Sequence, residues 1–281
     1  MKKLKQIDTY LEIIDDVKKD DIKLSNDFLS KEAVERYIRL GRMFYTKCEG
    51  GYIFFSDEER FYKAVLYVDP DKEWRIESAD KPIMARTRYR KGKKKDDLIK
   101  LEGAMLNNGF ELKDHFMEIK LDGKKNKARF ESEFIRSKKI LERMNWKIKV
   151  ANYSQYNEIK DILENQKILK WFHEDYSTEE EIKIRLDRGD YICIVDECNK
   201  VLAYNSGYEL NGCWYGDGIF VRNEYKMYGL APILQYYRGI ISGDMVRKGV
   251  ILLNNTPTIK FHRSMGWQFM DKCIDCWLKE V

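Results

Sequence analysis

The sequence is poor in the residues that link or break domains. Only four of its 281 residues are proline, and no stretch is rich in serine, glycine and proline together. No apolar run approaches the roughly 20 residues of a membrane-spanning helix. The first residues, MKKLKQ, lead into charged residues rather than the apolar core of a signal peptide. We therefore expect a cytoplasmic protein that does not enter a membrane.

An excess of charge of one sign is also lacking. The 52 lysines and arginines nearly balance the 47 aspartates and glutamates, which leaves a net charge of +5. This is not the balance of a dedicated nucleic-acid binder. The densest basic stretch, residues 86–95, is open to two interpretations, a phosphate contact or a solvated strand end and loop. We favour the second, because only Tyr89 supplies an aromatic ring for stacking.

The six cysteines give little sign of metal or redox chemistry. Most lie in or near expected strands, where cysteine acts as a small hydrophobic residue. Cys273 and Cys276 have C-x-x-C spacing, but a zinc site needs two further ligands at matching spacing. A thioredoxin-like motif belongs at a helix start, whereas these residues fall in an expected C-terminal strand. The sequence therefore predicts no metal site.

Hydrophobic periodicity divides the chain into two halves of similar order, as its length suggests. In the first half we expect helices at residues 3–19, 33–40 (capped by Ser30 or Asn26) and 96–107, and strands at 51–56, 61–68, 83–89 and 116–121. A helix over residues 131–145 joins the halves, with 123–127 as the hinge. The second half reads as a hairpin, 191–195 and 201–208, then strands at 213–221 and 250–253 with a helix between them.

The most informative segment follows the strand that ends at residues 219–221. A turn with two small residues, Gly229 and Ala231, leads directly into a helix. Backbone N–H groups at a helix N-terminus point outward and attract anions, and the helix dipole adds to the attraction. Glycine keeps side chains away from such an anion. The segment therefore predicts a phosphate-binding turn.

This segment and a second one together resemble the GNAT superfamily of acyl-coenzyme A N-acyltransferases. The first matches the family pattern (Arg/Gln)-x-x-Gly-x-(Gly/Ala) through Lys226, Gly229 and Ala231. The second keeps the spacing of the family pattern Asn-x6-Tyr-x3-Gly-Phe. The four positions are occupied by Asn255, His262, Gly266 and Trp267. The resemblance extends from about residue 148 to the end. Lys226 replaces the usual Arg or Gln, and His262 replaces the usual Tyr.

The resemblance implies an α+β fold of two GNAT-like domains, each a mixed, mostly antiparallel sheet flanked by helices. We expect a degenerate first domain at residues 1–122, a linker and connecting helix at 123–147, and an acyl-coenzyme A-binding domain at 148–281. The first half also ends a helix in Gly109-Phe110, but it lacks the phosphate turn, and Met105 stands where the second half has His262. An unrelated α+β domain is the alternative for the first half.

The resemblance also implies the roles of individual residues in a transfer from acetyl-coenzyme A, or another acyl-coenzyme A, to a small-molecule or peptide amine. Coenzyme contacts are expected from ten residues: Ile219, Phe220, Val221, Lys226, Met227, Tyr228, Gly229, Leu230, Ala231 and Asn255. His262 would protonate the leaving thiolate, or else pack while water does so. Asp217 is the candidate general base, with Glu209 as the weaker one. Trp171, Tyr176, Tyr204 and Tyr208 would line the acceptor site or belong to the core.

Two other functions remain open at this point. Tandem GNAT-like folds include aminoacyl-tRNA-dependent transferases, for which the basic stretch would contact RNA. The intact phosphate turn speaks against this alternative. A non-catalytic acyl-coenzyme A sensor is the other, and His262 in place of tyrosine keeps it open.

Overall fold

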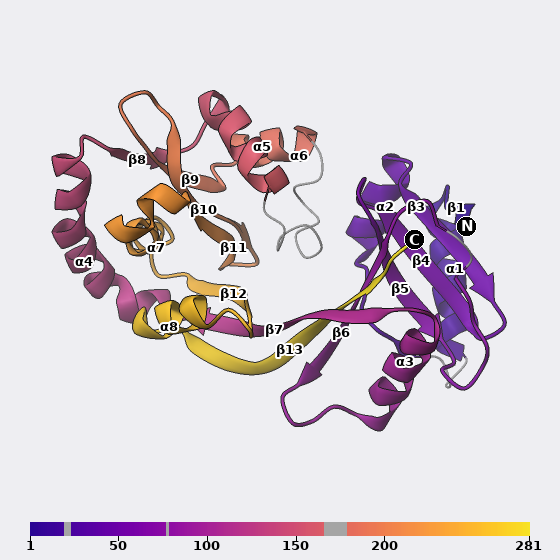
Figure 1. Ribbon diagram of the computed structural model, residues 1–281. Helices are drawn as coiled ribbons and strands as arrows, with labels where there is room; N and C mark the ends of the chain where they lie inside the picture. Colours follow the sequence, from indigo (N-terminus) through magenta and orange to yellow (C-terminus); the bar gives the residue numbers. More distant parts are fainter. Residues whose placement is uncertain (20–23, 77–78, 166–178) are drawn as a thin grey trace. The chain divides into compact units, whose positions relative to one another are not determined.

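The computed structural model describes residues 1–19, 24–76, 79–165 and 179–281 (Figure 1). The chain divides into two compact units, a first unit of Met1–Phe116 with Asp271–Val281 and a second unit of Met117–Met270. Each unit has a mixed, mostly antiparallel sheet covered by helices. The expected α+β class with two domains is confirmed, but the boundaries differ from those expected at residues 122 and 148. The chain's last residues lie with the first unit.

The first unit's sheet has the strand order β1-β3-β4-β5-β6-β13-β7. The parallel pair in this order is β5–β6, whereas β1–β3, β3–β4, β4–β5 and β6–β13 are antiparallel. The strands are β1 (Lys2–Lys3), β3 (Met43–Cys48), β4 (Gly51–Asp57), β5 (Tyr62–Val68), β6 (Ile83–Arg90), β7 (Glu111–Leu121) and β13 (Gln268–Lys279), with β2 (Leu24–Ser25) paired to β5. The sequence did not predict β3.

Helices cover both faces of this sheet because side chains alternate along each strand. Phe54 of β4 faces α1 (Ile7–Lys19) and α2 (Lys31–Arg39), whereas its neighbours face α3 (Asp96–Asn107). Ser30 caps α2 by accepting from the N–H of Ala33 at 3.2 Å. Asn26, the other candidate cap, bonds instead to the backbone of β5. The three expected helices of this half are confirmed, with α3 at the expected bounds.

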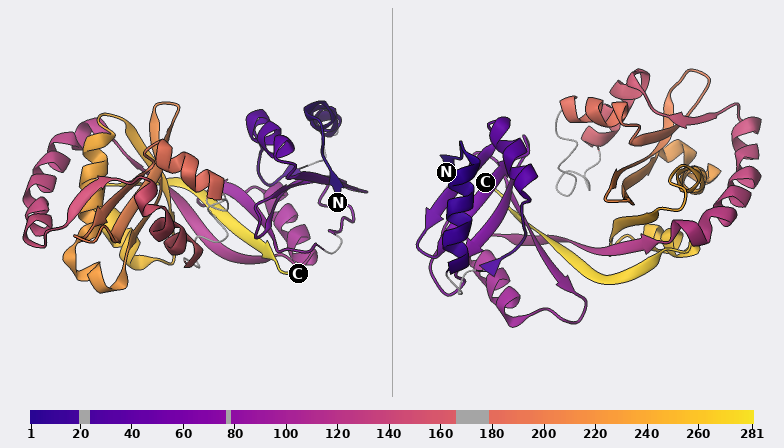
Figure 2. Two further views of the ribbon diagram at one scale, coloured as in Figure 1. Left: turned by 90° about the horizontal axis from the view of Figure 1, so that it is seen from above. Right: turned by 180° about the vertical axis from the view of Figure 1, so that it is seen from behind.

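The second unit's sheet has the order β7-β12-β11-β10-β9-β8, with β7 represented by its last residues. Helices α4 and α7 pack on one face and α5 and α6 on the other, as Figure 2 shows. The elements are α4 (Gly123–Arg143), β8 (Lys147–Val150), η1 (Tyr153–Gln155), α5 (Tyr156–Asn165), α6 (Glu179–Asp187), β9 (Tyr191–Val195), β10 (Val201–Leu210), β11 (Cys213–Val221), η4 (Asn223–Tyr228), α7 (Leu230–Ile241), β12 (Val246–Leu252) and α8 (Thr256–Ser264).

The expected hinge at residues 123–127 is wrong, because these residues are the first turns of α4. Asp122 caps the helix by accepting from the N–H of Lys125 at 3.1 Å. Gly123 is held against the turn before β12, where an added Cβ would lie 2.1 Å from the Met245 carbonyl oxygen. A capped and closely packed helix start does not act as a hinge.

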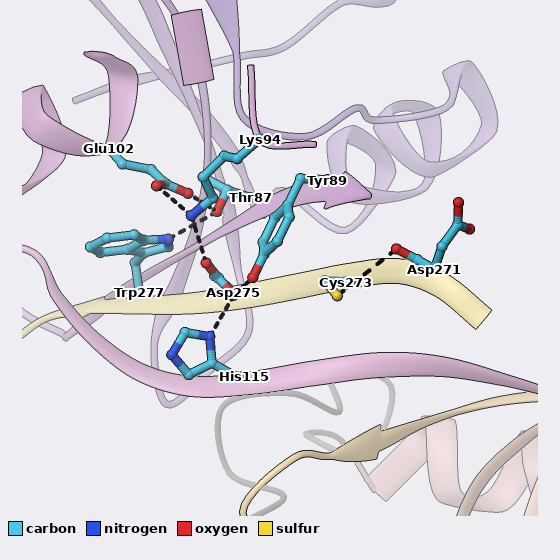
Figure 3. Close-up of polar contacts among 9 residues, drawn as sticks. All are labelled: Thr87, Tyr89, Lys94, Glu102, His115, Asp271, Cys273, Asp275 and Trp277. Carbon is cyan, nitrogen blue, oxygen red and sulfur yellow. Dashed lines mark hydrogen bonds and ion pairs between the residues drawn. The ribbon is translucent and has the colours of Figure 1, made fainter. Parts of the chain in front are cut away.

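A buried polar network holds the returning strand β13 in the first unit (Figure 3). The carboxylate of Asp275, 1% exposed, accepts from Tyr89 (3.0 Å), Lys94 (3.0 Å) and His115 (2.7 Å). Lys94 also bonds to Glu102 of α3 at 2.6 Å. The network thus ties β13 to β6, β7 and α3 through charged groups that satisfy one another.

Part of the basic stretch at residues 86–95 is committed to ion pairs within the first unit. Arg86 and Arg88 pair with Asp27 at 3.2 and 3.0 Å, and Lys94 pairs within the Asp275 network. The side chain of Arg86 is only 11% exposed. The expectation of a solvated stretch is therefore wrong for Arg86 and Lys94, and their charges are not free for a phosphate backbone.

Candidate functional site

The site predicted in the second half lies where two parallel strands separate. β11 and β12 pair only at their first residues, from Cys213↔Val246 to Tyr215↔Lys248. Both strands continue, β11 to Val221 and β12 to Leu252, without further pairing to each other. Between them the backbone of β11 therefore keeps an edge that no described strand occupies.

The direction of the backbone groups on this edge follows from the pleat. Arg222 N–H donates to Leu202 of β10 at 2.9 Å, so the groups of every second residue before it also point towards β10. Ile219 and Val221 then point their N–H and C=O groups the other way, towards the gap. This edge can pair with an extended chain of amides, such as the pantetheine arm of coenzyme A.

The turn after β11 presents a helix N-terminus without a capping side chain. Gly229 has φ +70°, a left-handed conformation, and no atom lies within 4 Å of the position a Cβ would take. Leu230 and Ala231 begin α7, so their N–H groups have no acceptor within that helix. The next residue is Pro232, which has no N–H. The turn therefore offers free donors and open space, as a pyrophosphate requires.

Aromatic packing fixes the approach to this turn. Tyr225 and Tyr228 of η4 contact the ring of Trp146, with centroids 5.4 and 5.1 Å away. The residues between them, Lys226 and Met227, are exposed, and Met227 is 95% exposed. The aromatic face of η4 thus packs inward, and the Lys226 side chain lies on the solvent side, where it can meet a phosphate.

His262 lies on α8 with one ring nitrogen committed. Its Nδ1 is 2.9 Å from the carbonyl oxygen of Thr258, one helical turn earlier. A carbonyl only accepts hydrogen bonds, so the proton is on Nδ1 and Nε2 carries a lone pair. No described residue hydrogen-bonds to Nε2. The ring of the half-buried His262 also meets Trp267 edge-on, with centroids 5.4 Å apart.

The surroundings favour the neutral imidazole. Burial lowers the pKa of His262 below its ordinary value, and the positive charge of Arg247 lowers it further, while the bond to Thr258 opposes them. At neutral pH the ring is therefore a proton acceptor at Nε2. To protonate a thiolate, as the sequence suggested, it must first take up a proton.

Asn255 serves as the N-cap of α8. Its side-chain oxygen accepts from the Thr258 N–H at 3.2 Å, and Pro257 stands in the first turn. This bond orients the helix turn that carries the acceptor for His262. The structure thus gives Asn255 a structural role, whereas its predicted coenzyme contact stays a prediction.

Asp217 is the extra residue of a β-bulge. Ser206 pairs with Gly218 and Gly207 with Gly216, which leaves Asp217 without a partner in the ladder. Its side chain is 12% exposed and ion-paired with Arg185 of α6, a buried residue that the sequence analysis missed. This ion pair connects the bulge of β11 to α6, and the predicted role of Asp217 as general base stays a prediction.

The remaining candidates for the acceptor site differ in their surroundings. Tyr204 is buried and stacks on Phe220 at 5.8 Å, so it belongs to the core. Tyr208 is half-buried and stacks on Tyr215, and Glu209 is exposed. Trp171 and Tyr176 lie outside the described residues.

Metal and membrane chemistry find no support in the described part of the chain. Within it no cluster of three or more His, Cys, Asp or Glu side chains could hold a metal ion. Cys273 and Cys276 are buried and form no disulfide, and their odd spacing puts them on opposite faces of β13. None of the described helices combines the length and apolarity needed to cross a bilayer.

Comparison with solved structures finds the same architecture in several proteins. The acetyltransferase region of a fungal multi-domain β-N-acetylglucosaminidase, described as a GCN5-related glucosamine N-acetyltransferase, aligns over 96% of this chain and 36% of its own, with a TM-score of 0.58 and 11% identity. A tandem GNAT protein from the clavulanic acid pathway aligns over 85% and 83%, at 0.50 and 10%. A Drosophila protein aligns over 98% and 97%, at 0.53 and 11%.

The chain has the GNAT fold. No protein-family model and no curated protein matches its sequence. At about 10% identity these likenesses concern the fold and not the substrate. In the GNAT fold of this chain, the gap between β11 and β12, the Gly229 turn and α8 all belong to the second unit.

Proposed function

We propose that the second unit binds an acyl-coenzyme A, with acetyl as the first candidate acyl group, and transfers the acyl group to a small-molecule or peptide amine. The observation that carries the proposal is the combination of the free edge of β11 with the uncapped start of α7. An extended amide chain fits the edge, and a pyrophosphate fits the helix N-terminus that follows it.

In this proposal the donor is held by backbone more than by side chains. Ile219 and Val221 pair with the pantetheine amides, and one free N–H of β11 donates to the oxyanion as the thioester carbonyl is attacked. Gly229, Leu230 and Ala231 surround the pyrophosphate. Lys226 adds a charge at the solvent side, and Phe220, Met227, Tyr228 and Asn255 complete the predicted coenzyme contacts.

His262 moves the proton that the reaction must transfer. Its neutral Nε2 takes a proton from the attacking amine as the C–N bond forms, and the resulting imidazolium returns one to the thiolate as the C–S bond breaks. One residue thus performs the two proton transfers that the sequence divided between Asp217 and His262. Asp217 keeps its partner Arg185 and holds the bulge.

The test is release of free coenzyme A thiol from acetyl-coenzyme A, followed with a panel of amines and with the protein's thermal shift recorded in parallel. A thermal shift together with amine-dependent thiol release is the expected result. A thermal shift with no release on any amine would leave the sensor function. No thermal shift with any acyl-coenzyme A would refute the donor site and leave the aminoacyl-tRNA-dependent function for test.

A further inference from the structure

Arg247, the second residue of β12, is a buried cation without a described carboxylate partner. It is 1% exposed, and its guanidinium lies over the rings of Trp267 (5.3 Å) and Phe130 (5.4 Å). Its hydrogen bonds run to the backbone and side-chain oxygens of Gln235, and its Nε has no partner among the described residues. Burying a charge without an opposite charge is unfavourable, so its placement calls for a physical reason.

The charge nevertheless persists at neutral pH. Burial lowers the pKa of Arg247 to about 9, which leaves the guanidinium protonated at pH 7. Because the side chain is surrounded by aromatic rings rather than water, its field is weakly screened and acts over several ångströms.

The neighbour that feels this field is His262. The ring of Trp267 contacts the Arg247 guanidinium and also meets the His262 ring at 5.4 Å. The backbone N–H of Trp267 donates to the His262 carbonyl oxygen at 3.0 Å. One aromatic residue therefore holds the cation and the imidazole in a fixed arrangement.

Other charged groups near α8 are directed elsewhere. Arg263, the next residue on the helix, lies over the Phe269 ring at 5.0 Å, and Arg129 of α4 donates to the Ser264 carbonyl at 2.8 Å. Of the charged side chains that the structure describes, Arg247 is the one whose charge acts on the imidazole.

We infer that Arg247 is a positioning residue for His262, whose buried and unneutralised charge keeps the imidazole neutral and leaves Nε2 ready to accept a proton. The use of this arrangement in catalysis rests on the proposed acyl transfer. The effect of Arg247 on the imidazole does not, because it is present in the free protein. With the charge of Arg247 nearby, the imidazole stays neutral at pH values where an ordinary histidine is already protonated. Its Nε2 can therefore accept a proton over a wider pH range.

The test is a pH titration of the imidazole signals by NMR in the free, full-length protein. The chain has only three histidines, and His262→Phe assigns the signal in question. Arg247→Met removes the charge while keeping an unbranched side chain against Trp267, and Arg247→Lys keeps the charge. Gln235→Glu keeps the side-chain shape and gives Arg247 the carboxylate it lacks.

We expect the titration midpoint of His262 to rise by at least about 0.5 pH unit in Arg247→Met and in Gln235→Glu, and to stay near the wild-type value in Arg247→Lys. The spectra of wild type and of the three variants are recorded under the same conditions, so that each His262 signal is compared directly. An unchanged His262 midpoint in both charge-altering variants would overturn the inference. Should Arg247→Met fail to fold, the nearly isosteric Gln235→Glu decides alone.

The same experiment separates this inference from the proposed function. A shifted midpoint in a protein that transfers no acyl group upholds the inference and refutes the function. Acyl transfer together with an unshifted His262 midpoint upholds the function and refutes the inference. Where both hold, the acid limb of kcat/KM moves to higher pH in step with the NMR midpoint in Arg247→Met and Gln235→Glu.

Discussion

The two units end a helix in the same way but place different residues at that end. In the second unit the backbone N–H of Trp267 donates to the carbonyl oxygen of His262 at 3.0 Å, and Gly266 between them has φ +83°. In the first unit the backbone N–H of Phe110 donates to the carbonyl oxygen of Met105 at 3.1 Å, and Gly109 between them has φ +81°. Met105 is fully buried in the core, whereas His262 is half-buried with a free ring nitrogen. The backbone motif is shared, and the proton-accepting group is not.

The strand pairs repeat this contrast. β5 and β6 pair in parallel over Tyr62–Ala64 only, as β11 and β12 pair over Cys213–Tyr215. In the second unit η4 and α7 follow the first of these strands. The described residues between β5 and β6 form no helix, and Trp74 and Ile76 from this connection are buried in the core. In our proposal the separated strand pair of the second unit holds the donor because a helix N-terminus follows it there.

The largest expected effect tests what each unit depends on for stability. Asp275→Asn removes the buried charge that accepts from Tyr89, Lys94 and His115, and we expect the first unit to lose about 3 kcal/mol. Hydrogen exchange should accelerate in β6 and much less in β11. The control is Asp271→Asn, whose ion pair with Arg90 is exposed. Equal acceleration in both variants would show that the network contributes little.

The next effect concerns the two equivalent helix ends. His262→Phe should lower the turnover rate about 100-fold or more while coenzyme binding changes little, because the proton moves only during the reaction. Met105→Phe, at the equivalent position of the first unit, should leave turnover near the wild-type value. His262→Tyr restores the residue usual in GNAT proteins, but a neutral phenol can only protonate the thiolate and cannot take the proton of the amine, so only part of the activity should remain. A Phe variant as fast as wild type would remove His262 from the mechanism.

A pair of glycines gives a matched test of the donor site. Gly229 and Gly109 both have positive φ, and a Cβ at either would meet no atom within 4 Å. Glutamate strains the backbone at both positions, but only at Gly229 would it also put a carboxylate beside the pyrophosphate. We expect Gly229→Glu to weaken acetyl-coenzyme A binding at least about tenfold, or 1.4 kcal/mol. Titration calorimetry with acetyl-coenzyme A measures the affinity of both variants. Equal affinities in Gly229→Glu and Gly109→Glu would contradict the assignment of the pyrophosphate to the Gly229 turn.

The smallest effect is expected at Lys226. Backbone N–H groups hold most of the pyrophosphate in our account, so Lys226→Gln should weaken binding by no more than about fivefold. The loss should shrink as salt is raised, because the side chain is exposed and its charge is screened. A loss as large as that of Gly229→Glu would shift the account from backbone to side-chain recognition.

Local signals in the sequence were sufficient where a motif lies in one continuous segment. The turn at Gly229, the helix over Asp96–Asn107 and the Gly266-Trp267 helix end could each be read from neighbouring residues. The helix start at Gly123 was predicted to be a hinge, although Asp122 before it is a favourable N-cap.

Features that depend on distant residues could not be predicted. The ion pair of Arg185 with Asp217 joins α6 to a bulge, and the placement of Arg247 depends on Trp267 and Gln235 from two other segments. The return of Asp271–Val281 to the first unit likewise follows from pairing with β6, far away in the sequence. The residues next to an arginine in the sequence do not show whether it is buried, especially in a chain with many surface charges.

The central claim is that one of two similar units binds the donor. Isothermal titration of the full-length protein with acetyl-coenzyme A tests it most directly, because the stoichiometry counts the sites. The account predicts one site per chain, lost or much weakened in Gly229→Glu and kept in Gly109→Glu. Two sites per chain, or one site that survives Gly229→Glu unchanged, would contradict it.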